Sequence, residues 1–401
     1  MLDPAAINKD DLIQMRRFLH ENPGVSRQEQ EASELVMAQL QAQDVPFTRV
    51  GPYGVLGIIE GGSPGPSIFL RADMDALPIT ESQVNLSQKK TAVSKKEGAA
   101  HLCGHDAHTA ILLGVMKVLA PMREKLKGTV LLAFEQDEET GSGVKPMIEA
   151  LKPYNPSTGW GLHVNSFIET GTISLLSGPS LAGGIYLEVE VYGESGHGST
   201  PHLAKDALLC AANMVTALSN VTARDIAPDA SAVLSIGTFQ SGDAFNAIAD
   251  KAHFAGSSRY FDEEVGQQMD VSIRRIVESV SSMFGCRYSF IGLVHRKPTF
   301  NDPLVTDLAR KAVSGAGIRL VEGRPLTASE TFAYYEELCP TTFAFLGTGK
   351  ADKGTLNAPF HNPVFDIDED ALEVGVRGTC AVALELLEYY AGDRLNQPDQ
   401  T

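Results

Sequence analysis

The sequence predicts a mixed α/β protein with two domains, one of them inserted into the other. Its 401 residues exceed what one hydrophobic core usually supports. In the first part of the chain, short apolar runs alternate with stretches of helical periodicity, which is typical of a sheet covered by helices. From about residue 183, apolar and polar residues alternate one by one, which indicates half-buried antiparallel strands.

The chain is expected to begin with two helices. Apolar residues at helical spacing between Leu12 and Leu19 predict the first helix. Ser26 followed by Glu29 has the pattern of a capping box, which predicts that the second helix opens there and continues to about Leu40. Apolar runs then predict three strands separated by turns and by one helix, and these elements cover residues 55–59, 68–72, 111–119 (the helix) and 130–134.

Residues that can bind metals directly follow the predicted strands. Asp73 and Asp75 come after the second apolar run, Glu138 and Glu139 come after the third, and His163 follows a further short run. Sites in open α/β sheets gather at the carboxyl ends of the strands. The sequence therefore predicts that these side chains lie close together.

The inserted part, residues 183–297, has the βαββαβ pattern of a ferredoxin-like module. Its expected elements are strands at 185–191, 232–237, 252–260 and 287–294 and helices at 207–218 and 265–280. After it the pattern returns to mixed α/β, with a strand at 342–346 and a closing helix from Glu369 to about Tyr389. We therefore expect a discontinuous larger domain made of residues 1–182 and 298–401.

Composition and charge exclude several classes of partner. The chain is 43% hydrophobic and 21% charged, as in soluble globular proteins, and its formal net charge of −17 disfavours binding to nucleic acid. No apolar run approaches the roughly 18 residues of a membrane span, and Met1–Met15 lacks the apolar core of a signal peptide. The five cysteines are widely spread, which suits reduced thiols. We expect a cytoplasmic protein without nucleic-acid or membrane partners.

The run from His101 to His108 carries the strongest chemical signal. It contains a thiol, several imidazoles and a carboxylate, and Cys103 and His105 flank a single glycine. Thiolate and imidazole together suit zinc and similar divalent ions. The run alone is also compatible with a buried cysteine beside scattered histidines. Further donor-rich segments at 71–78, 135–139, 161–164 and 358–363 favour a metal site.

With these motifs the chain resembles the M20 peptidase family of dinuclear metallohydrolases, in particular its amidohydrolase subfamily of hippurate hydrolase-like and N-acyl-amino-acid hydrolases. The family motifs Met-His-Ala-Cys-Gly-His-Asp, Ala-Glu-Glu, Gly-Leu-His and Leu-His-Ser-Pro match segments of this chain. The resemblance implies five metal ligands, which are Cys103, His105, Glu139, His163 and His361. We expect two divalent ions (zinc, manganese, cobalt or nickel) that share the Cys103 thiolate, with His105 and His163 completing one site and Glu139 and His361 the other.

Further roles follow from the same resemblance and from the position of each residue. Glu138 is expected to act as general base toward water activated by the metals. Asp75 would orient a ligand imidazole. Asp106 could orient an imidazole as well, or could cap a helix that begins near His108. His101 and His108 are expected to be structural.

The inserted module resembles the family's lid and dimerisation domain. Its segment Gly193–His202 is similar to the lid motif, in which the first histidine assists the oxyanion, and this implies that role for His197. Asn246 and Arg259 lie in motifs that imply binding of a substrate carboxylate. Because these groups lie on the inserted module and not beside the metals, we expect domain closure to be part of catalysis. The resemblance also implies a homodimer.

Three positions depart from the family pattern. Asp137 replaces alanine beside the proposed base and would add negative charge there, Ala249 replaces proline, and Thr331 replaces an aspartate. No proposed ligand is affected, but the pocket is expected to differ.

We expect a metal-dependent amidohydrolase that cleaves the amide bond of N-acyl amino acids or related small-molecule conjugates, like an aminoacylase. A dipeptidase or carboxypeptidase would use the same machinery. A protein that only binds amino-acid conjugates is disfavoured because the ligands and the base Glu138 are all present.

Overall fold

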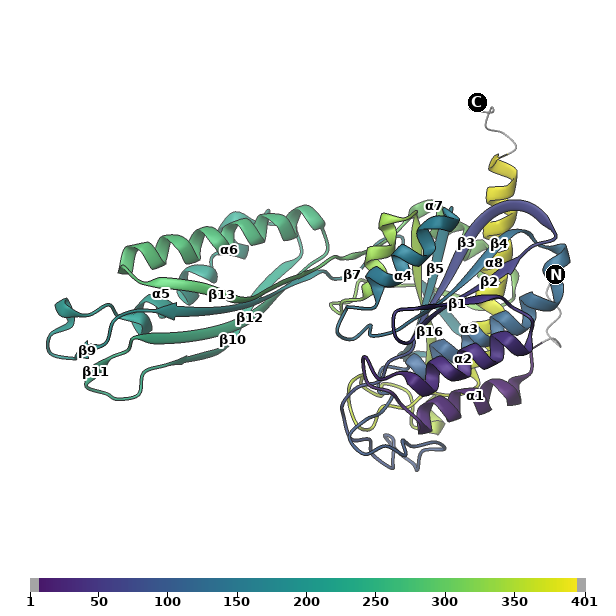
Figure 1. The fold of residues 1–401 in the computed structure, drawn as a ribbon, viewed down its shortest axis with the longest axis horizontal. Helices are drawn as coiled ribbons and strands as arrows, with labels where there is room; N and C mark the ends of the chain where they lie inside the picture. The colour runs from purple at the N-terminus through teal and green to yellow at the C-terminus, as the bar shows by residue number, and fades with distance from the viewer. Residues whose placement is uncertain (1–6, 395–401) are drawn as a thin grey trace. The chain divides into compact units, whose positions relative to one another are not determined.

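The computed structural model describes residues 7–394, which divide into two units (Figure 1). Unit 1 contains the residues up to Gly178, Phe300–Arg324 and the residues from Tyr334 onward, and unit 2 contains Pro179–Thr299 and Pro325–Ala333. Residues 325–333, expected in the discontinuous domain, therefore group with unit 2. The two ends of that domain, residues 1–6 and 395–401, lie outside the described part. The chain passes between the units in two short paired strands, β7 (Gly178–Leu181) and β14 (Thr299–Asn301).

Unit 1 is built on an eight-stranded mixed sheet, as the α/β prediction requires. Its middle strands β4, β3, β5 and β16 run parallel to one another, so their carboxyl ends lie along one edge. The strands in spatial order are β1 (Phe47–Val50), β2 (Gly54–Glu60), β4 (Lys127–Glu135), β3 (Ser63–Asp73), β5 (Thr158–Glu169), β16 (Thr341–Gly349), β6 (Thr172–Leu175) and β15 (Arg319–Glu322).

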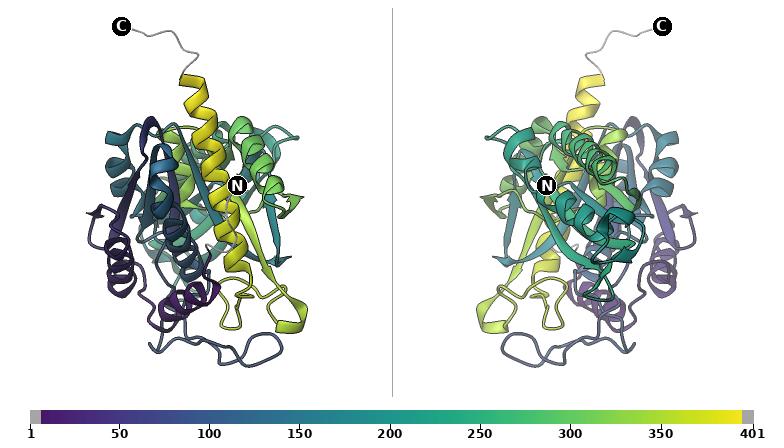
Figure 2. Two further views of the ribbon diagram at one scale, coloured as in Figure 1. Left: turned by 90° about the vertical axis from the view of Figure 1, so that its right-hand side faces the viewer. Right: turned by 90° about the vertical axis from the view of Figure 1, so that its left-hand side faces the viewer.

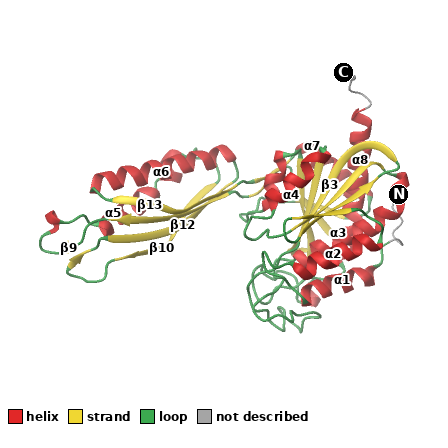
Figure 3. Ribbon diagram, viewed as in Figure 1, coloured by secondary structure: helices red, strands yellow, loops and turns green. Residues whose placement is uncertain are grey.

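Helices cover both faces of this sheet (Figure 3). One layer contains α1 (Lys9–Glu21), α2 (Gln30–Ala42), α3 (His105–Leu119), α7 (Pro303–Gly315) and α8 (Ala371–Arg394). In this layer α8 lies along the middle strands and contacts α1, α3 and α7 (Figure 2). The helix α4 (Val144–Leu151) packs against β1, β2 and β4, and its apolar side chains lie outside the core that α3 and α8 share.

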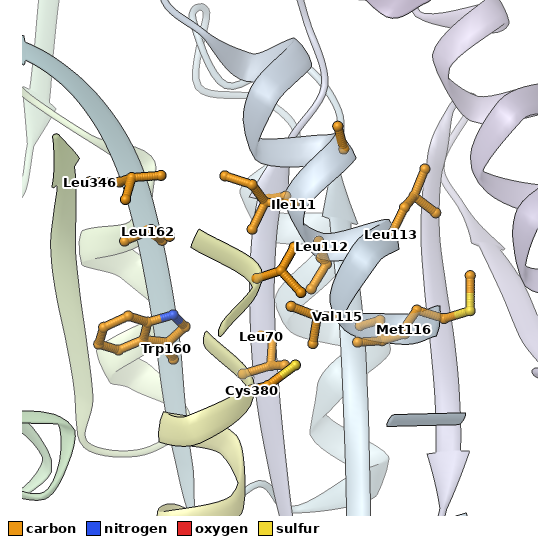
Figure 4. Close-up of a cluster of buried hydrophobic side chains, with 14 of the residues drawn as sticks. Leu70, Ile111, Leu112, Leu113, Val115, Met116, Trp160, Leu162, Leu346 and Cys380 are labelled. Atoms are coloured by element: carbon orange, nitrogen blue, oxygen red, sulfur yellow. The ribbon is translucent and has the colours of Figure 1, made fainter. Parts of the chain in front are cut away.

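The core of unit 1 is centred on α3, which explains why this helix is apolar on all sides. Every residue of α3 except Lys117 is buried. Its side chains lie near Leu70 of β3 and Trp160 of β5 (Figure 4). The indole nitrogen of Trp160 donates a hydrogen bond to Thr379 of α8 at 3.2 Å. Full burial of each large apolar side chain stabilises the fold by about 1.5–3 kcal/mol. This packing holds the amino end of α3 at the carboxyl edge of the sheet.

Unit 2 contains a four-stranded antiparallel sheet in the order β10-β12-β8-β13 with two helices, and its elements follow the predicted order βαββαβ. Its inward-facing residues Ile185, Leu187, Val189 and Val191 are fully buried, whereas the residues between them are not. The elements are β8 (Gly184–Tyr192), α5 (Ala207–Leu218), β10 (Ala232–Ser241), β12 (Lys251–Tyr260), α6 (Glu263–Phe284) and β13 (Arg287–Arg296), with a small pair formed by β9 (Gly196–His197) and β11 (Ala247–Ile248).

Two predicted helix starts were wrong. The expected capping box does not form, because the Ser26 hydroxyl donates to Asp75 Oδ2 at 2.7 Å and α2 begins at Gln30 without a side-chain cap. The helix α3 begins at His105 and not near His108, after Gly104 with φ of 91°. The closing helix α8 also runs a few residues beyond its predicted end. In the described range 7–394, no helix combines the length and apolar character needed to cross a membrane.

Candidate metal centre

The carboxyl edge of the unit 1 sheet brings the predicted donor side chains together. Asp75 follows β3, Glu139 follows β4, and His163 lies in β5. His105 is the first residue of α3, and His361 lies in the segment before α8. The clustering that strand order implied is therefore present, although these residues are far apart along the chain.

Gly104 allows the cysteine and histidine of the octapeptide to approach β5. Its backbone has φ of 91°, a conformation that L side chains rarely adopt. A Cβ atom at this position would lie 2.2 Å from Cγ2 of Val164. Only glycine can place Cys103 and His105 on either side of this turn with the chain so close to the strand.

The donor atoms form two groups of three that share Cys103. One group contains Cys103, His105 and His163, the other contains Cys103, Glu139 and His361, and the atoms of each group lie within 4.8 Å of one another. Within them, Cys103 Sγ is 3.5 Å from His163 Nε2, and His361 Nε2 is 3.3 Å from Glu139 Oε1. Glu138 forms a further group with His105 and Glu139. Cys103 is therefore the donor that the first two groups have in common.

Hydrogen bonds at the outer ring nitrogens fix which nitrogen each histidine offers. His163 Nδ1 donates to the Val164 carbonyl at 2.7 Å, which leaves Nε2 facing Cys103. His105 Nδ1 donates to Asp75 Oδ1 at 3.1 Å. Metal-bound histidines usually have such a carbonyl or carboxylate partner. Asp75 Oδ2 also accepts the backbone N–H of Glu139 at 3.1 Å, so one carboxylate positions two donor residues.

His108 lies beside the cluster but uses both ring nitrogens elsewhere. Its Nε2 accepts the backbone N–H of Val164 at 2.9 Å, and its Nδ1 donates to Asp73 Oδ1 at 2.5 Å. It therefore has no nitrogen to offer an ion, although His105, His108 and Asp73 lie within metal-binding distance of one another. His101 is buried, and burial lowers its pKa to about 4, so it is neutral at pH 7. Both findings agree with structural roles for these two histidines.

The chemistry of the donors fits divalent cations of the zinc type. Burial raises the pKa of the Cys103 thiol, and Glu139 and Glu138 raise it further, so sulfur stays protonated unless a cation binds. Burial lowers the pKa of His163 and keeps its imidazole neutral. A set of sulfur, imidazole and carboxylate donors suits zinc and its neighbours in the first transition series.

Asp106 has neither of the roles considered from sequence. Its Oδ2 lies 2.8 Å from Arg16 Nε and 2.8 Å from His20 Nδ1, and all three side chains are buried. His20 Nε2 in turn donates to Glu81 Oε1 at 2.8 Å. The carboxylate therefore anchors α1 to the amino end of α3. Arg16 was missed because an arginine on an amphipathic helix normally indicates the solvent-exposed face.

Asp137 does not present an unbalanced charge to the proposed base, contrary to expectation. Its Oδ2 accepts from Arg27 Nε at 2.9 Å, and its side chain also accepts from the hydroxyls of Thr140 and Ser142. Asp137 has φ of 56° and its backbone N–H donates to Glu29 Oε1 at 2.8 Å. These contacts hold the turn that presents Glu138 and Glu139. The other two departures lie in unit 2, where the Ala249 carbonyl accepts from Ala207 N–H and Thr331 Oγ1 donates to Glu330.

The predicted oxyanion and carboxylate groups all belong to unit 2. His197 is exposed in β9, and its Nδ1 accepts from the Ser199 hydroxyl at 2.7 Å and from the Ser199 backbone N–H at 3.1 Å. Asn246 is exposed beside β11. Arg259 donates from Nε to Thr327 and from Nη1 to Ser258, both backbone carbonyls of the same unit. Their catalytic roles stay predictions.

Comparison with known proteins identifies the family. The family model described as peptidase family M20/M25/M40 matches residues 69–385. An IAA-amino acid hydrolase (ILR1-like 4) of Arabidopsis thaliana is 34% identical over 399 residues, which cover 98% of this chain and 89% of that protein. Thermostable carboxypeptidase 2 of Saccharolobus solfataricus is 36% identical over 384 residues, which cover 94% of this chain and 95% of that protein.

A solved structure supports the same relationship. The Bacillus subtilis YXEP protein, described as a dinuclear metal binding peptidase from the M20 family, has a TM-score of 0.82 at 31% identity and covers 96% of this chain and 99% of its own. The chain therefore belongs to peptidase family M20/M25/M40 and is a metal-dependent amidohydrolase or peptidase of that family.

Proposed function

We propose that this enzyme hydrolyses the amide bond of N-acyl amino acids or related amino-acid conjugates. The observation that carries the proposal is the pair of three-residue groups that share Cys103. In this proposal His105 and His163 complete one metal site, and Glu139 and His361 complete the other. Two divalent cations held there would lower the pKa of a water molecule and polarise the carbonyl of a bound amide.

Glu138 is the proposed general base. It is buried beside His105 and Glu139, and the turn at Asp137 directs neighbouring carboxylates into one cluster. Its carboxylate would take a proton from the attacking water and pass it to the nitrogen of the leaving amino acid. The developing oxyanion needs a further donor, for which we propose His197. Asn246 and Arg259 would hold the substrate carboxylate. We further propose that residues 183–297 form the lid and pair subunits into a homodimer.

An aromatic surface beside the cluster supports a substrate with a bulky apolar group. The ring of Phe360 lies 5.6 Å from the His163 ring, and the ring of Phe167 lies 6.4 Å from that of Phe360. Phe167 is 55% exposed, which is high for a phenylalanine. Stacking on such rings contributes about 0.5–1.5 kcal/mol beyond burial of apolar area. The likeness to an IAA-amino acid hydrolase points in the same direction.

The test is a substrate panel with metal reconstitution. N-benzoylglycine, N-acetylglycine and a dipeptide are assayed after chelation and after addition of zinc, manganese, cobalt or nickel. We expect turnover only with metal, and faster turnover of the benzoyl than of the acetyl substrate. Turnover that survives complete chelation would refute the mechanism. Preference for the dipeptide would favour a dipeptidase or carboxypeptidase, the second candidate, which the likeness to thermostable carboxypeptidase 2 supports.

Glu138→Gln tests the base separately. We expect this variant to keep both ions and to have a rate about 10²–10⁴-fold lower than the wild type, because a general base usually contributes that much. Glu149→Gln is the matched control, because Glu149 is an exposed residue of α4 whose one ion pair among the described residues is with Lys152. A rate for Glu138→Gln equal to that of the control would remove Glu138 from this role.

A further inference from the structure

A large groove lies in unit 1 at the opposite end of the sheet from the metal cluster. It has a volume of about 1420 Å³ and is lined by the starts of β3 and β4 and by α7 and α8. The strand β3 starts at this end at Ser63 and ends at Asp73 beside the cluster. At about 3.3 Å per residue, that places the groove roughly 30 Å from the metal donors. It is therefore a separate cavity.

The walls of the groove are apolar and are left open by small residues. Ala312 and Gly315 of α7 and the following Ala316 line one side, and Ala381 and Leu384 of α8 line the other. The groove is open to solvent on one side and runs beside the contact between α7 and α8. Its volume exceeds the usual range for small-molecule pockets, which is about 300–1,000 Å³. The groove can hold an apolar body of considerable length.

The charges around this apolar space are predominantly positive. Arg377 of α8 lines it, its Nε atom is buried, and among residues 7–392, whose side chains the structure describes, this side chain has neither a hydrogen bond nor an ion pair. Lys125 and Lys127 are exposed at the rim, and neither has a carboxylate partner in the described part of the chain. Lys311 forms an ion pair with Glu385 at 2.6 Å. Among the other residues that line the groove, Glu388 is acidic, whereas Lys125, Lys127 and Arg377 are basic.

The Arg377 side chain is partly exposed, but its Nε atom is buried, and an anion in the groove would supply the acceptor that this nitrogen lacks. From these features we propose that the groove binds an amphipathic anion, namely a molecule with one carboxylate and an extended apolar chain. The carboxylate accepts from Arg377, and the chain lies along the small residues of α7 and α8. A positive groove is notable in a protein with a net charge of −17. The inference does not depend on the reaction that the metal centre catalyses.

The test uses octanoate as the probe and calorimetric titration of the full-length holoenzyme. We expect saturable binding of octanoate, with octan-1-ol at least about tenfold weaker because it lacks the charge. Inorganic phosphate alone should not compete, because it lacks the chain. Absence of saturable binding, or equal affinity for the alcohol, would overturn the proposal without any variant. Repetition with chelator shows whether octanoate binds to metal, and binding that disappears on chelation would also overturn it.

Variants then locate the site. Arg377→Met should weaken octanoate binding about tenfold or more, and Arg377→Lys should restore part of it. Arg310→Met is the matched control, since Arg310 lies on α7 and already contacts Asp307 and the Leu175 carbonyl. An equal loss in the control would overturn the assignment. A second result would also overturn the assignment: the wild type does not bind octanoate, and Arg377→Met changes the sedimentation coefficient. That result would indicate that the groove is a contact between copies of the chain.

Discussion

The buried arginine of α1 gives the sharpest test of how unit 1 is held together. Arg16 is 1% exposed, its Nε lies 2.8 Å from Asp106 Oδ2, and its Nη1 lies 3.5 Å from Glu369 Oε1. Burial opposes its charge, yet Asp106 and Glu369 outweigh burial and raise the pKa of the guanidinium. Arg16→Met keeps an unbranched apolar stem and removes the guanidinium group with its charge. Asp106 then remains as a buried carboxylate with His20 as its one cation at hydrogen-bond distance among the described residues.

The expected loss follows from that uncompensated carboxylate. Breaking a buried ion pair by removing one partner typically costs 3–5 kcal/mol. Because His20 stays in place, we expect a value near the lower end, about 3 kcal/mol. Arg17→Met is the matched control, since Arg17 is the next residue, is 41% exposed and pairs with the same Glu369 at 2.6 Å. An exposed pair of this kind contributes at most about 1 kcal/mol.

The single tryptophan makes the measurement specific to unit 1. Trp160 is the only tryptophan of the chain and is 1% exposed in β5, so its fluorescence follows unfolding of this unit in urea. A loss of about 3 kcal/mol moves the midpoint by roughly 1 M if the slope is about 3 kcal/mol/M. The double variant Arg16→Met/Asp106→Asn should recover part of the loss, since it removes the stranded charge. Losses in Arg16→Met and Arg17→Met that agree within about 1 kcal/mol would refute the reasoning.

Three further predictions concern the metal cluster and its support. Gly104→Ala should lower the metal content and reduce the free energy of unfolding by more than about 2 kcal/mol, because the new Cβ would lie 2.2 Å from a methyl group of Val164. The control Gly171→Ala has a similar φ of 88° and nothing within 4 Å of the new Cβ, so it should lose only about 1 kcal/mol through backbone strain. Equal losses in urea unfolding would contradict this. Burial raises the pKa of Glu29 to about 7, so the neutral form is favoured in the metal-free folded protein. The contribution of Glu29 to the free energy of unfolding is therefore complete below the unfolded pKa near 4.5 and is lost as the pH rises through 7. We expect Glu29→Gln to be more stable than the wild type at pH 8 by up to about 3 kcal/mol and to differ little from it at pH 4.5. A difference independent of pH would show that Glu29 does not titrate in this range. Cys103→Ser should reduce both bound ions, whereas His361→Gln should reduce one, as elemental analysis can measure; loss of a single ion in both variants would argue against a shared sulfur.

The sequence was most informative where local pattern and chemistry coincide. Asp75, Glu139 and His163 come from predicted strands or their ends, and parallel strands place their carboxyl ends at one edge, so the meeting of these three residues could be expected. Cys103 and His361 follow no predicted strand, and their place in the cluster was expected only from the family resemblance. The alternating pattern of β8 likewise determined which of its side chains are buried. Both inferences rest on regularities that extend over several residues and do not depend on distant partners.

Contacts between distant segments account for what sequence reasoning missed. Ser26 and Glu29 have the spacing of a capping box, but Asp75 and the backbone of Asp137 are stronger partners for their side chains than the amino end of α2. Arg16 has a position that would suit a surface residue, and only the arrival of α3 beside α1 buries it. In each case a side chain with an ordinary local role is used to connect two elements.

The charge of the metal centre links folding to ion binding. Asp73, Asp75, Glu135 and Glu138 are all buried at one edge of the sheet, and Arg71 is the arginine that contacts two of them, at 2.7 Å each. The Cys103 thiol adds a further negative charge when it loses its proton, which burial opposes. Divalent cations that bind the folded donors and not the unfolded chain stabilise the fold by mass action, with about 2.7 kcal/mol at a hundredfold excess over Kd. Removal of the ions should therefore destabilise unit 1 as well as abolish turnover. The packing of the buried helix α3 holds the carboxylates of the site close together although their charges repel one another.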